Sequence, residues 1–404
     1  WMFGRDRAAT VEWLWQKFAK KPVIAEANIA ALNAGHALAE TAEVLDGFHG
    51  YELEKAHIEP GLYRAVTGAE AMAWGLAAAD VLADLDTVFC SYPITPASDI
   101  LHELSKHKNF GVQTFQAEDE IAAVASSVGA AFGGHLALTT TSGPGVALKG
   151  EAIGLAFNLE LPLVIVDIQR GGPSTGLPTK TEASDLMMAM YGRHGESPIP
   201  VIAPYSPGNC FHVAIEASRI ALKYRTPVML LSDGYLANGS EPWKFPNIED
   251  LKQFKMNFIK QNDDFQPYKR DEKLARPWVA PGTSGHEHRL GGLEKEDGTG
   301  NVCYDPENHL HMSKLRAKKV ELVADNIPLQ ELEGETSGDV LVISWGGTYG
   351  ATHMAVRQLQ KEGCKVSLMH LKYISPLPKN VGELLKNFKH ILVPELNMGQ
   401  MVHI

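Results

Sequence analysis

Short apolar segments alternate with alanine-rich segments of helical periodicity through the middle of the chain. The apolar segments 163–168 and 227–232 have no polar alternation, which predicts strands that are buried on both faces. Thr67 and Glu70 have the spacing of a capping box at the start of a helix. Because strands that alternate with helices usually form a parallel sheet covered by helices, the pattern predicts an α/β fold. The expected strands are 87–90, 135–140, 163–168 and 227–232, and the expected helices are 67–85 and 120–132.

Both ends of the chain carry further predicted elements. Residues 10–18 and 22–42 have helical periodicity, and residues 51–62 have the composition of a linker. A second α/β unit begins near Gly338, and a strand-like run lies at 390–393. The other expected elements of this unit are a strand at 339–344, a glycine-rich turn at 346–350, a helix at 351–362 and a strand at 365–370.

The segment 242–315 differs from its surroundings. It is polar, rich in His, Gly and charged residues, and only weakly periodic. A long excursion of this kind is typical of a functional loop or of a connection between domains. The chain begins at Trp1 rather than Met and ends at Ile404, just after a predicted strand, so we expect a piece of a longer polypeptide.

Composition excludes several classes of function. The 404 residues predict two to three domains, and 45% hydrophobic and 21% charged residues are ordinary for a soluble globular protein. The net charge of −11 argues against binding to nucleic acid or to an anionic membrane. No apolar run approaches the length of a membrane span. The four cysteines form no Cys-x-x-Cys pair, which argues against a local zinc or iron–sulfur motif and favours a reducing cytoplasm.

Polar motifs follow several predicted strands at their carboxyl ends, the edge at which open α/β sheets bind ligands. In Ser91–Pro96, Pro93 and Pro96 would hold Thr95 in a rigid turn that presents its hydroxyl; the alternative is a stiff connection to a helix capped by Ser98 or Asp99. A second motif, Thr139–Gly145, is rich in hydroxyl groups, although such loops are often simple turns.

Arg170 follows the most apolar strand and therefore needs an anionic partner. The partner is either a carboxylate of the protein or the carboxylate of a substrate, which the guanidinium fork suits. Lys180 and His194 add cationic or donor groups downstream.

Three acidic residues, Glu118, Asp119 and Glu120, open the alanine-rich helix. The helix dipole favours carboxylates at this position, which explains at least one of them. A carboxylate held against apolar walls could instead have a raised pKa and transfer protons. The residues alone leave the choice among the three open.

Three further motifs resemble phosphate-binding or metal-binding sites, but each is better explained as an ordinary turn or as exposed loop residues. The glycine-rich turn Gly346–Gly350 has the general shape of a phosphate cradle but not the full dinucleotide-binding pattern. Gly145–Gly150 has P-loop spacing, but Glu151 follows where Lys and Ser or Thr are required. The pairs His286/His288 and His309/His311 could together hold a metal ion, although exposed loop histidines are common.

Four of these motifs together resemble the alpha subunits of 2-oxoacid:ferredoxin oxidoreductases. The resemblance rests on Tyr92–Pro96, Glu118–Ala123, Thr140–Gly145 and, most specifically, on Gln169–Thr181 (QRGGPSTGLPTKT). It covers about residues 60–404, and the N-terminal helices resemble the end of the family's gamma domain, fused in front. The segments 275–278, 291–301 and 304–308 are most similar to the 2-oxoglutarate branch.

The resemblance implies a domain order. The expected fold is a thiamine-diphosphate-binding, pyrimidine-type α/β domain with a parallel sheet, followed by a second α/β domain that is Rossmann-like or similar to the C-terminal domain of transketolase. The expected parts are the helices of a gamma-type domain with a linker at 1–58, the pyrimidine-binding domain at 59–245, the polar connection at 246–335 and the second α/β domain at 336–404, cut at its end.

The resemblance also implies divided thiamine-diphosphate chemistry. The alpha chain would bind the pyrimidine half of the cofactor, and a partner beta subunit would hold its diphosphate, Mg²⁺ and a [4Fe–4S] cluster. The sequence agrees, since it contains neither a Gly-Asp-Gly signature nor a set of cluster-binding cysteines. The implied reaction interconverts 2-oxoglutarate with succinyl-CoA and CO₂, with coenzyme A as co-substrate and ferredoxin as electron carrier, in an (αβ)₂ assembly. It can run as CO₂ fixation, as in a reductive TCA cycle, or in reverse.

Residue roles follow from the same resemblance. Glu120 would hydrogen-bond the pyrimidine ring, beside Pro93 and Ser142 at the cofactor. Thr95 and Arg170 would bind the substrate, with Arg170 at its C1 carboxylate. Lys180 and His194 are candidates for the second carboxylate. The alternatives are an enzyme for pyruvate or a branched-chain 2-oxoacid, a non-catalytic scaffold subunit, and a nucleotide-binding protein that uses the 346–350 turn.

Overall fold

The computed structural model describes residues 1–41, 51, 54, 56–256, 258–259 and 264–404. The chain divides into two compact units, Trp1–Gly61 and Leu62–Ile404. The first unit contains the helices α1 (Ala8–Lys17) and α2 (Pro22–Thr41), both at the positions that helical periodicity predicts.

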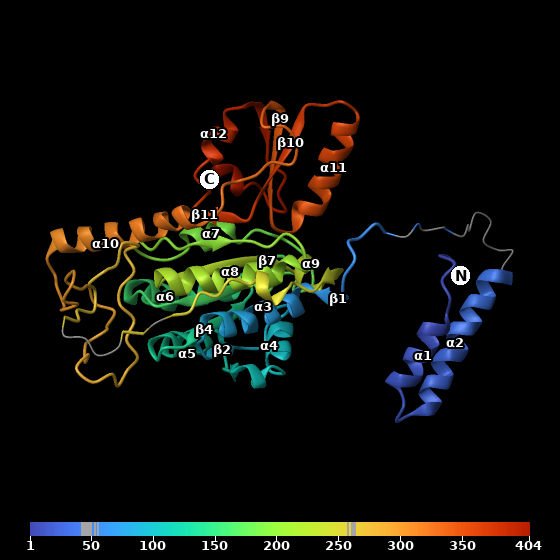
Figure 1. Cartoon of the computed structure of the whole chain (residues 1–404), viewed down its shortest axis with the longest axis horizontal. Helices are drawn as coiled ribbons and strands as arrows, with labels where there is room; N and C mark the ends of the chain where they lie inside the picture. The colour runs from blue at the N-terminus through green and yellow to red at the C-terminus, as the bar shows by residue number, and fades with distance from the viewer. Residues whose placement is uncertain (42–50, 52–53, 55, 257, 260–263) are drawn as a thin grey trace. The chain divides into compact units, whose positions relative to one another are not determined.

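A seven-stranded sheet forms the core of the second unit, with the strand order β11-β6-β7-β5-β4-β2-β3 (Figure 1). All neighbouring strands are parallel except β11, which is antiparallel to β6. The predicted parallel α/β fold is therefore confirmed. The strands are β2 (Thr87–Ser91), β3 (Gln113–Gln116), β4 (Leu136–Thr141), β5 (Leu163–Gln169), β6 (Val201–Ile202), β7 (Pro227–Asp233) and β11 (Tyr373–Ser375).

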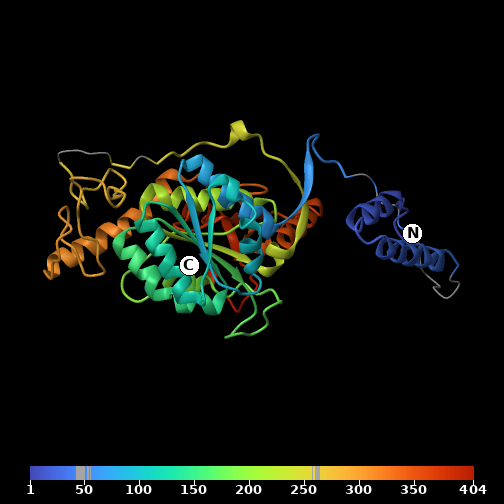
Figure 2. The ribbon, with the colours of Figure 1, turned by 90° about the horizontal axis from the view of Figure 1, so that it is seen from below.

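Helices cover both faces of this sheet (Figure 2). Along β5, Val164 and Val166 pack toward α3, α4 and α8, whereas Leu163 and Ile165 pack toward α5, α6 and α7. Both faces of the strand are thus apolar, which explains why its sequence lacks polar alternation. The helices are α3 (Gly68–Ala83), α4 (Ser98–Leu104), α5 (Glu120–Phe132), α6 (Gly143–Leu159), α7 (Leu186–Tyr191), α8 (Asn209–Tyr224) and α9 (Gly234–Asn238).

The helix starts test two predicted caps. At α3, the Glu70 amide donates to the Thr67 hydroxyl and the Glu70 carboxylate accepts from the Thr67 amide, so the predicted capping box is confirmed. At α4, the expectation of a cap from Ser98 or Asp99 is wrong. The Ser98 hydroxyl instead bonds the backbone of Ile94, because the preceding proline turn folds back onto it.

A smaller parallel sheet of order β10-β9-β12, drawn in orange to red in Figure 1, follows in the second half of the unit. Side chains such as Trp345 and Met369 join the apolar cluster that also includes Leu231 of β7, so the two sheets share a core. The elements are β9 (Gly338–Trp345), α11 (Tyr349–Lys361), β10 (Val366–Leu371), α12 (Val381–Leu385) and β12 (Phe388–Leu392).

The polar segment 242–315 connects the strands of the first sheet to those of the second along the chain. Its described residues pack onto the main domain and lead into α10 (Pro306–Glu321). Tyr268, Trp278 and Lys295 are buried in it, so much of this segment packs closely despite its composition. A two-stranded antiparallel sheet joins β1 (Tyr63–Thr67) to β8 (Ser240–Lys244). The short 3₁₀ helices are η1 (Lys108–Phe110), η2 (Ile248–Asp250), η3 (Leu322–Asn326), η4 (Gly346–Thr348) and η5 (Met401–His403).

Every helix in the described part of the chain is too short or too polar to cross a lipid bilayer.

Candidate active site

The parallel order of β2, β4, β5 and β7 brings four predicted motifs to one edge of the sheet. Tyr92, Ser142 and Arg170 directly follow β2, β4 and β5, and Asp233 ends β7. The helices α5 and α6 begin at the same edge, with Glu120 and Gly143 as their first residues. The hydroxyl-rich, acidic and cationic motifs therefore meet, although Tyr92 and Arg170 are 78 positions apart along the chain.

The three acidic residues at the start of α5 have different surroundings. Asp119 is the N-cap of the helix, and its carboxylate accepts a hydrogen bond of 2.8 Å from the Ala122 amide. Glu118 and Asp119 are exposed, whereas Glu120 is half-buried. Glu120 is also the one of the three whose side chain lies against α6, near Gly145. This placement separates three residues that the sequence alone could not.

Gly145 is required by the close approach of three side chains. The hydroxyl groups of Tyr92 and Thr141 are 2.9 Å apart beside it. A Cβ at Gly145 would lie 2.0 Å from the Thr141 Oγ1, 2.3 Å from the Tyr92 hydroxyl and 3.0 Å from the Glu120 Cγ. The P-loop interpretation of Gly145–Gly150 is wrong, because this segment lies within α6 and forms no loop.

Lys149 is a site residue that the sequence reasoning missed. Its buried Nζ donates hydrogen bonds of 3.1 Å to the Glu120 carbonyl and 3.1 Å to the Thr139 hydroxyl. It also lies 5.1 Å from the centre of the Tyr92 ring. Burial lowers the pKa of Lys149 to about 8. A lysine on the buried face of an apolar helix was the available signal.

Arg170 is nearly buried and forms no salt bridge with a carboxylate of the described residues, although its charge acts on the nearby Asp185 carboxyl and opposes the rise of the Asp185 pKa. Its Nη1 donates to the backbone carbonyl of Thr95. Its Nε is buried and has no hydrogen-bond partner among the described residues. The structure thus offers no support for the salt-bridge alternative and leaves donor capacity for a ligand. The Thr95 side chain is exposed and lines a cavity of about 160 Å³ with Thr179 and Asn238.

The remaining predicted residues divide into two places. The Lys180 carbonyl accepts a 2.9 Å hydrogen bond from the Gly171 amide, which returns its loop to the neighbourhood of Arg170, and its side chain is exposed. Pro93 is exposed at the same edge. The Ser142 hydroxyl is buried and donates a 2.9 Å hydrogen bond to the Ile168 carbonyl, so it joins β4 to β5.

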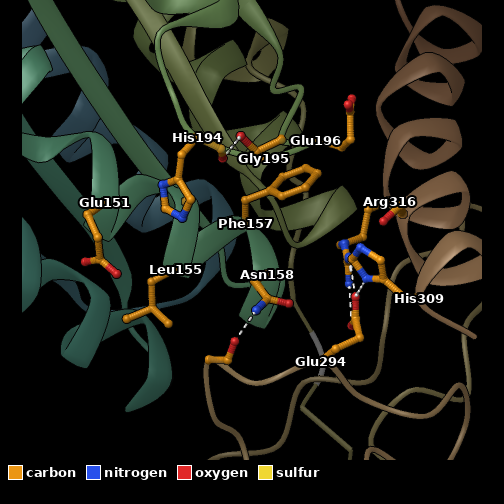
Figure 3. A pocket seen from close by; sticks show the side chains of 14 residues that line it. Glu151, Leu155, Phe157, Asn158, His194, Gly195, Glu196, Glu294, His309 and Arg316 are labelled. Atoms are coloured by element: carbon orange, nitrogen blue, oxygen red, sulfur yellow. Dashed lines mark hydrogen bonds and ion pairs between the residues drawn. The ribbon is translucent and has the colours of Figure 1, made fainter. Parts of the chain in front are cut away.

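His194 lies elsewhere. It lines a separate cavity of about 470 Å³ together with Glu151 and Arg316, near the middle and end of α6 (Figure 3). No contact within the described residues joins it to Arg170, so the structure does not bring these two predicted substrate residues together.

A fully buried carboxyl group, Asp167, and a half-buried one, Asp185, form a pair near the site that the sequence analysis also missed. Asp167 is fully buried, and neither oxygen has a conventional hydrogen-bond donor among the described residues. Its neighbour is Asp185; burial and the Asp185 carboxylate hold the pKa of Asp167 well above its ordinary value. Burial raises the pKa of Asp185 to about 6. A single aspartate within the apolar strand 163–168 was the signal for such a pair.

The glycine-rich turn at 346–350 contacts a carboxylate. The Gly347 amide donates a 3.2 Å hydrogen bond to the Asp233 Oδ2, and a Cβ at Gly347 would lie 2.5 Å from that oxygen. The Asp233 Oδ1 accepts from the Tyr235 and Leu236 amides at the start of α9. The turn therefore connects the second sheet to the first, and a carboxylate in front of it disfavours the phosphate-cradle interpretation.

The two histidine pairs do not form one cluster. His309 and His311 bond the carboxylates of Glu294 and Asp297, at 2.7 Å and 3.0 Å. His286 and His288 lie against the ring of Phe265. No group of three or more His, Cys, Asp or Glu side chains suited to a metal ion is present among the residues that the structure describes.

Comparison with known families and proteins gives consistent results. Residues 80–303 match the family model described as pyruvate flavodoxin/ferredoxin oxidoreductase, thiamine-diphosphate-binding. Residues 338–403 match the model described as pyruvate:ferredoxin oxidoreductase core domain II.

Individual relatives are similar over most or all of the chain. The 2-oxoglutarate oxidoreductase subunit KorA of Mycobacterium tuberculosis is 51% identical over 406 residues, which cover 100% of this chain and 62% of the relative. The 2-oxoglutarate synthase subunit KorA of Archaeoglobus fulgidus is 33% identical over 78% of this chain and 84% of its own length. The chain thus spans about three fifths of the M. tuberculosis relative.

A solved structure has the same fold. It is the 2-oxoglutarate:ferredoxin oxidoreductase from Magnetococcus marinus with 2-oxoglutarate, coenzyme A and succinyl-CoA bound. The match has a TM-score of 0.89 and 35% identity, and it covers 100% of this chain and 69% of the other.

Proposed function

Because the chain belongs to the 2-oxoacid:ferredoxin oxidoreductase family, we propose that it is the alpha part of a 2-oxoglutarate:ferredoxin oxidoreductase. The enzyme would interconvert 2-oxoglutarate and coenzyme A with succinyl-CoA and CO₂, and it would exchange electrons with ferredoxin. The names of the KorA relatives and the ligands of the M. marinus structure support this choice of substrate. The observation that most directly supports this function is the position of the half-buried Glu120 at the carboxyl edge of the parallel sheet, beside Tyr92 and Gly145.

The residues at this edge fit the pyrimidine half of thiamine diphosphate. The ammonium group of Lys149 bonds the backbone carbonyl of Glu120 rather than its carboxylate. Glu120 would accept or hold a proton at the pyrimidine ring nitrogen, with Pro93 and Ser142 as further residues that would hold the cofactor. Thiamine diphosphate, when bound, supplies the electron sink that decarboxylation of a 2-oxoacid requires.

Arg170 is the proposed ligand of the substrate C1 carboxylate. Its Nη1 is held by the Thr95 carbonyl, so the guanidinium is preorganised, and its Nε remains without a described partner. The exposed Thr95 hydroxyl would bind the substrate near its keto group. Lys180 is the proposed partner of the second carboxylate, because its loop returns to Gly171. The position of His194 in another cavity does not favour that role.

Partners are part of the same proposal. A beta subunit would hold the diphosphate, Mg²⁺ and a [4Fe–4S] cluster, and two αβ pairs would form the (αβ)₂ enzyme. Residues 1–58 would be the last helices of a gamma-type domain and its linker, ahead of the pyrimidine-binding domain at 59–245, the connection at 246–335 and the second α/β domain at 336–404. The four cysteines are free, which suits a reducing cytoplasm.

The decisive experiment is Glu120→Gln in the complete complex with its beta subunit. We expect loss of at least about 100-fold in coenzyme-A-dependent dye reduction with 2-oxoglutarate, because a positioned proton-transfer group contributes on this scale. Glu118→Gln is the matched control. Glu118 is exposed and lies two positions before Glu120, and this change removes the same charge. Gel filtration would verify that both variant complexes assemble.

Each alternative has its own outcome. Full activity of the Glu120→Gln complex would contradict the proposed site. Absence of activity with any 2-oxoacid, in a wild-type complex that carries cluster and cofactor, would favour the scaffold function. Activity with pyruvate or a branched-chain 2-oxoacid only would retain the mechanism and contradict the substrate.

A further inference from the structure

A second cavity opens at the amino ends of β5 and β7, on the edge of the sheet opposite the candidate active site. Its volume is about 410 Å³. Arg225 precedes β7 by two residues, and Glu160, which lies behind the cavity, precedes β5 by three. The length of β5 separates the two edges by roughly 20 Å, at about 3.3 Å for each residue of a parallel strand. The cavity is therefore distinct from the site of Glu120.

Positive charge predominates among the side chains that line this cavity. The cationic side chains are those of Arg225, Lys269, Arg270 and Arg276, and the anionic side chains are those of Asp264 and Asp271. Behind them, Glu160 and Lys319 add one charge of each sign. The Asp297 carboxylate, which lies 3.7 Å from the Arg270 Nε, adds a further negative charge, so one excess positive charge remains among these described side chains.

Two of the arginines are held in place by the protein. The Arg270 Nη1 and Nη2 donate to the two carboxylate oxygens of Glu160, at 2.5 Å and 2.6 Å. The Arg276 Nε donates to the Leu159 and Glu160 carbonyls, and its Nη1 donates to the Pro277 carbonyl at 2.9 Å. These contacts fix the walls of the cavity; they use most of the donors of Arg270 and the Nε and Nη1 groups of Arg276.

Arg225 is different because its donors are unused. Its side chain is 8% exposed, and its Nε is buried and forms no hydrogen bond with any described residue. Its guanidinium carbon lies 5.4 Å from the centre of the Trp278 ring, a cation–π contact that uses no N–H group. The backbone of Arg225 is held in the left-handed region, at φ +50°, and its carbonyl accepts from the Lys319 Nζ. A buried guanidinium without acceptors is costly unless a ligand supplies them.

We propose that this cavity is an anion-binding site for a phosphoryl group, with Arg225 as its principal ligand. A phosphoryl group would offset the excess positive charge and would present three acceptor oxygens, one more than a carboxylate presents. Its oxygens would accept from the unused N–H groups of Arg225. Lys269 lies at the exposed rim of the cavity, where it pairs with Asp264. Free phosphate and the phosphates of a nucleotide share this chemistry.

The test is a set of calorimetric titrations of the complete complex at constant ionic strength and without coenzyme A. The probes are inorganic phosphate, ADP and, as a carboxylate control, citrate. We expect saturable binding of phosphate or ADP to the wild type, and the stronger of the two identifies the source. Arg225→Gln should weaken that binding at least about tenfold, the effect expected for a lost charge-assisted hydrogen bond. Arg357→Gln, which removes the same charge from an exposed position on α11, should leave it unchanged.

Other results would overturn the proposal. They are the absence of saturable phosphate and ADP binding to the wild type, binding of citrate alone, or equal loss in Arg225→Gln and Arg357→Gln. If Arg225→Gln does not fold, Arg225→Lys retains the charge but loses the fork; wild-type affinity in that variant would contradict the role of the guanidinium. None of these outcomes depends on the activity of the enzyme, so the proposal can fail independently of the proposed function.

Discussion

The buried pair Asp167 and Asp185 predicts an unusual dependence of stability on pH. Burial raises the pKa of Asp185 from 3.8 to about 6, and it raises that of Asp167 as well. The folded chain therefore binds these protons more tightly than the unfolded chain does. As the pH rises from about 4 through 6, the unfolded chain ionises first, and the folded state loses stability.

The magnitude follows from the shift. About two pKa units at Asp185 correspond to about 3 kcal/mol lost above pH 6, at about 1.4 kcal/mol for each unit. The raised pKa values lead us to expect that the two carboxyl groups share a proton at low pH. In Asp167→Asn, the side-chain amide can donate to the Asp185 carboxylate in place of that proton, and one buried ionisable group disappears. Because burial of Asp185 itself persists, we expect only part of the loss to be recovered, about 1–2 kcal/mol at pH 8, and little change at pH 4.5.

Thermal unfolding of the wild type and the variant between pH 4.5 and 8 measures this effect. We expect a higher unfolding midpoint for Asp167→Asn at pH 8, by at least about 2 °C, and a difference that shrinks toward pH 4.5. Asp250→Asn is the matched control at an exposed position, and it should show no such trend. A variant that is destabilised equally at both pH values would refute the shared proton.

Three further changes test the packing around the site and the second cavity. Glu160→Gln leaves Arg270 and Lys319 without their buried carboxylate and should cost about 3–5 kcal/mol of unfolding free energy at pH 7, measured by denaturant titration against an exposed Glu→Gln control; a loss below about 1 kcal/mol would contradict the buried network. Gly145→Ala places a methyl group against the Tyr92 and Thr141 hydroxyl groups and should reduce activity of the complex at least tenfold, since small misplacements of catalytic groups are costly; wild-type activity would show that the contact is not tight. Thr67→Ala removes a hydrogen-bonded cap from α3 and should lower stability by about 1 kcal/mol, a change that a thermal melt detects and that an unaltered midpoint would disprove.

Local patterns along the chain predicted several of the strands and helices and the edge of the sheet that carries the site. The unbroken apolar runs at 163–168 and 227–232 predict β5 and β7 because a strand buried on both faces has no place for polar side chains. The motif Gln169–Thr181 and its companions carried the resemblance to the family, which the comparisons bear out. These patterns are local, so they can be recognised without knowing which elements are neighbours in the fold.

The tertiary structure decided which side chains meet. Glu120 is distinguished from Glu118 and Asp119 by its partial burial and by its contact with α6, and the Lys149 ammonium group reaches its backbone carbonyl across 29 residues of chain. His194, by contrast, lines a cavity that does not include Arg170, although only 24 positions separate the two residues. Distance along the chain does not show which side chains lie close together, because strand order and helix packing determine these contacts.

The same reason explains the groups that the sequence did not reveal. Whether a lone charged residue is solvated, paired or left without partners depends on burial by segments far away, as the contacts of Asp167 and Arg225 show. Composition and periodicity describe the surface that each element presents to its neighbours. Only the packed fold sets the free energy of each charge on that surface, and with it the chemistry available to the protein.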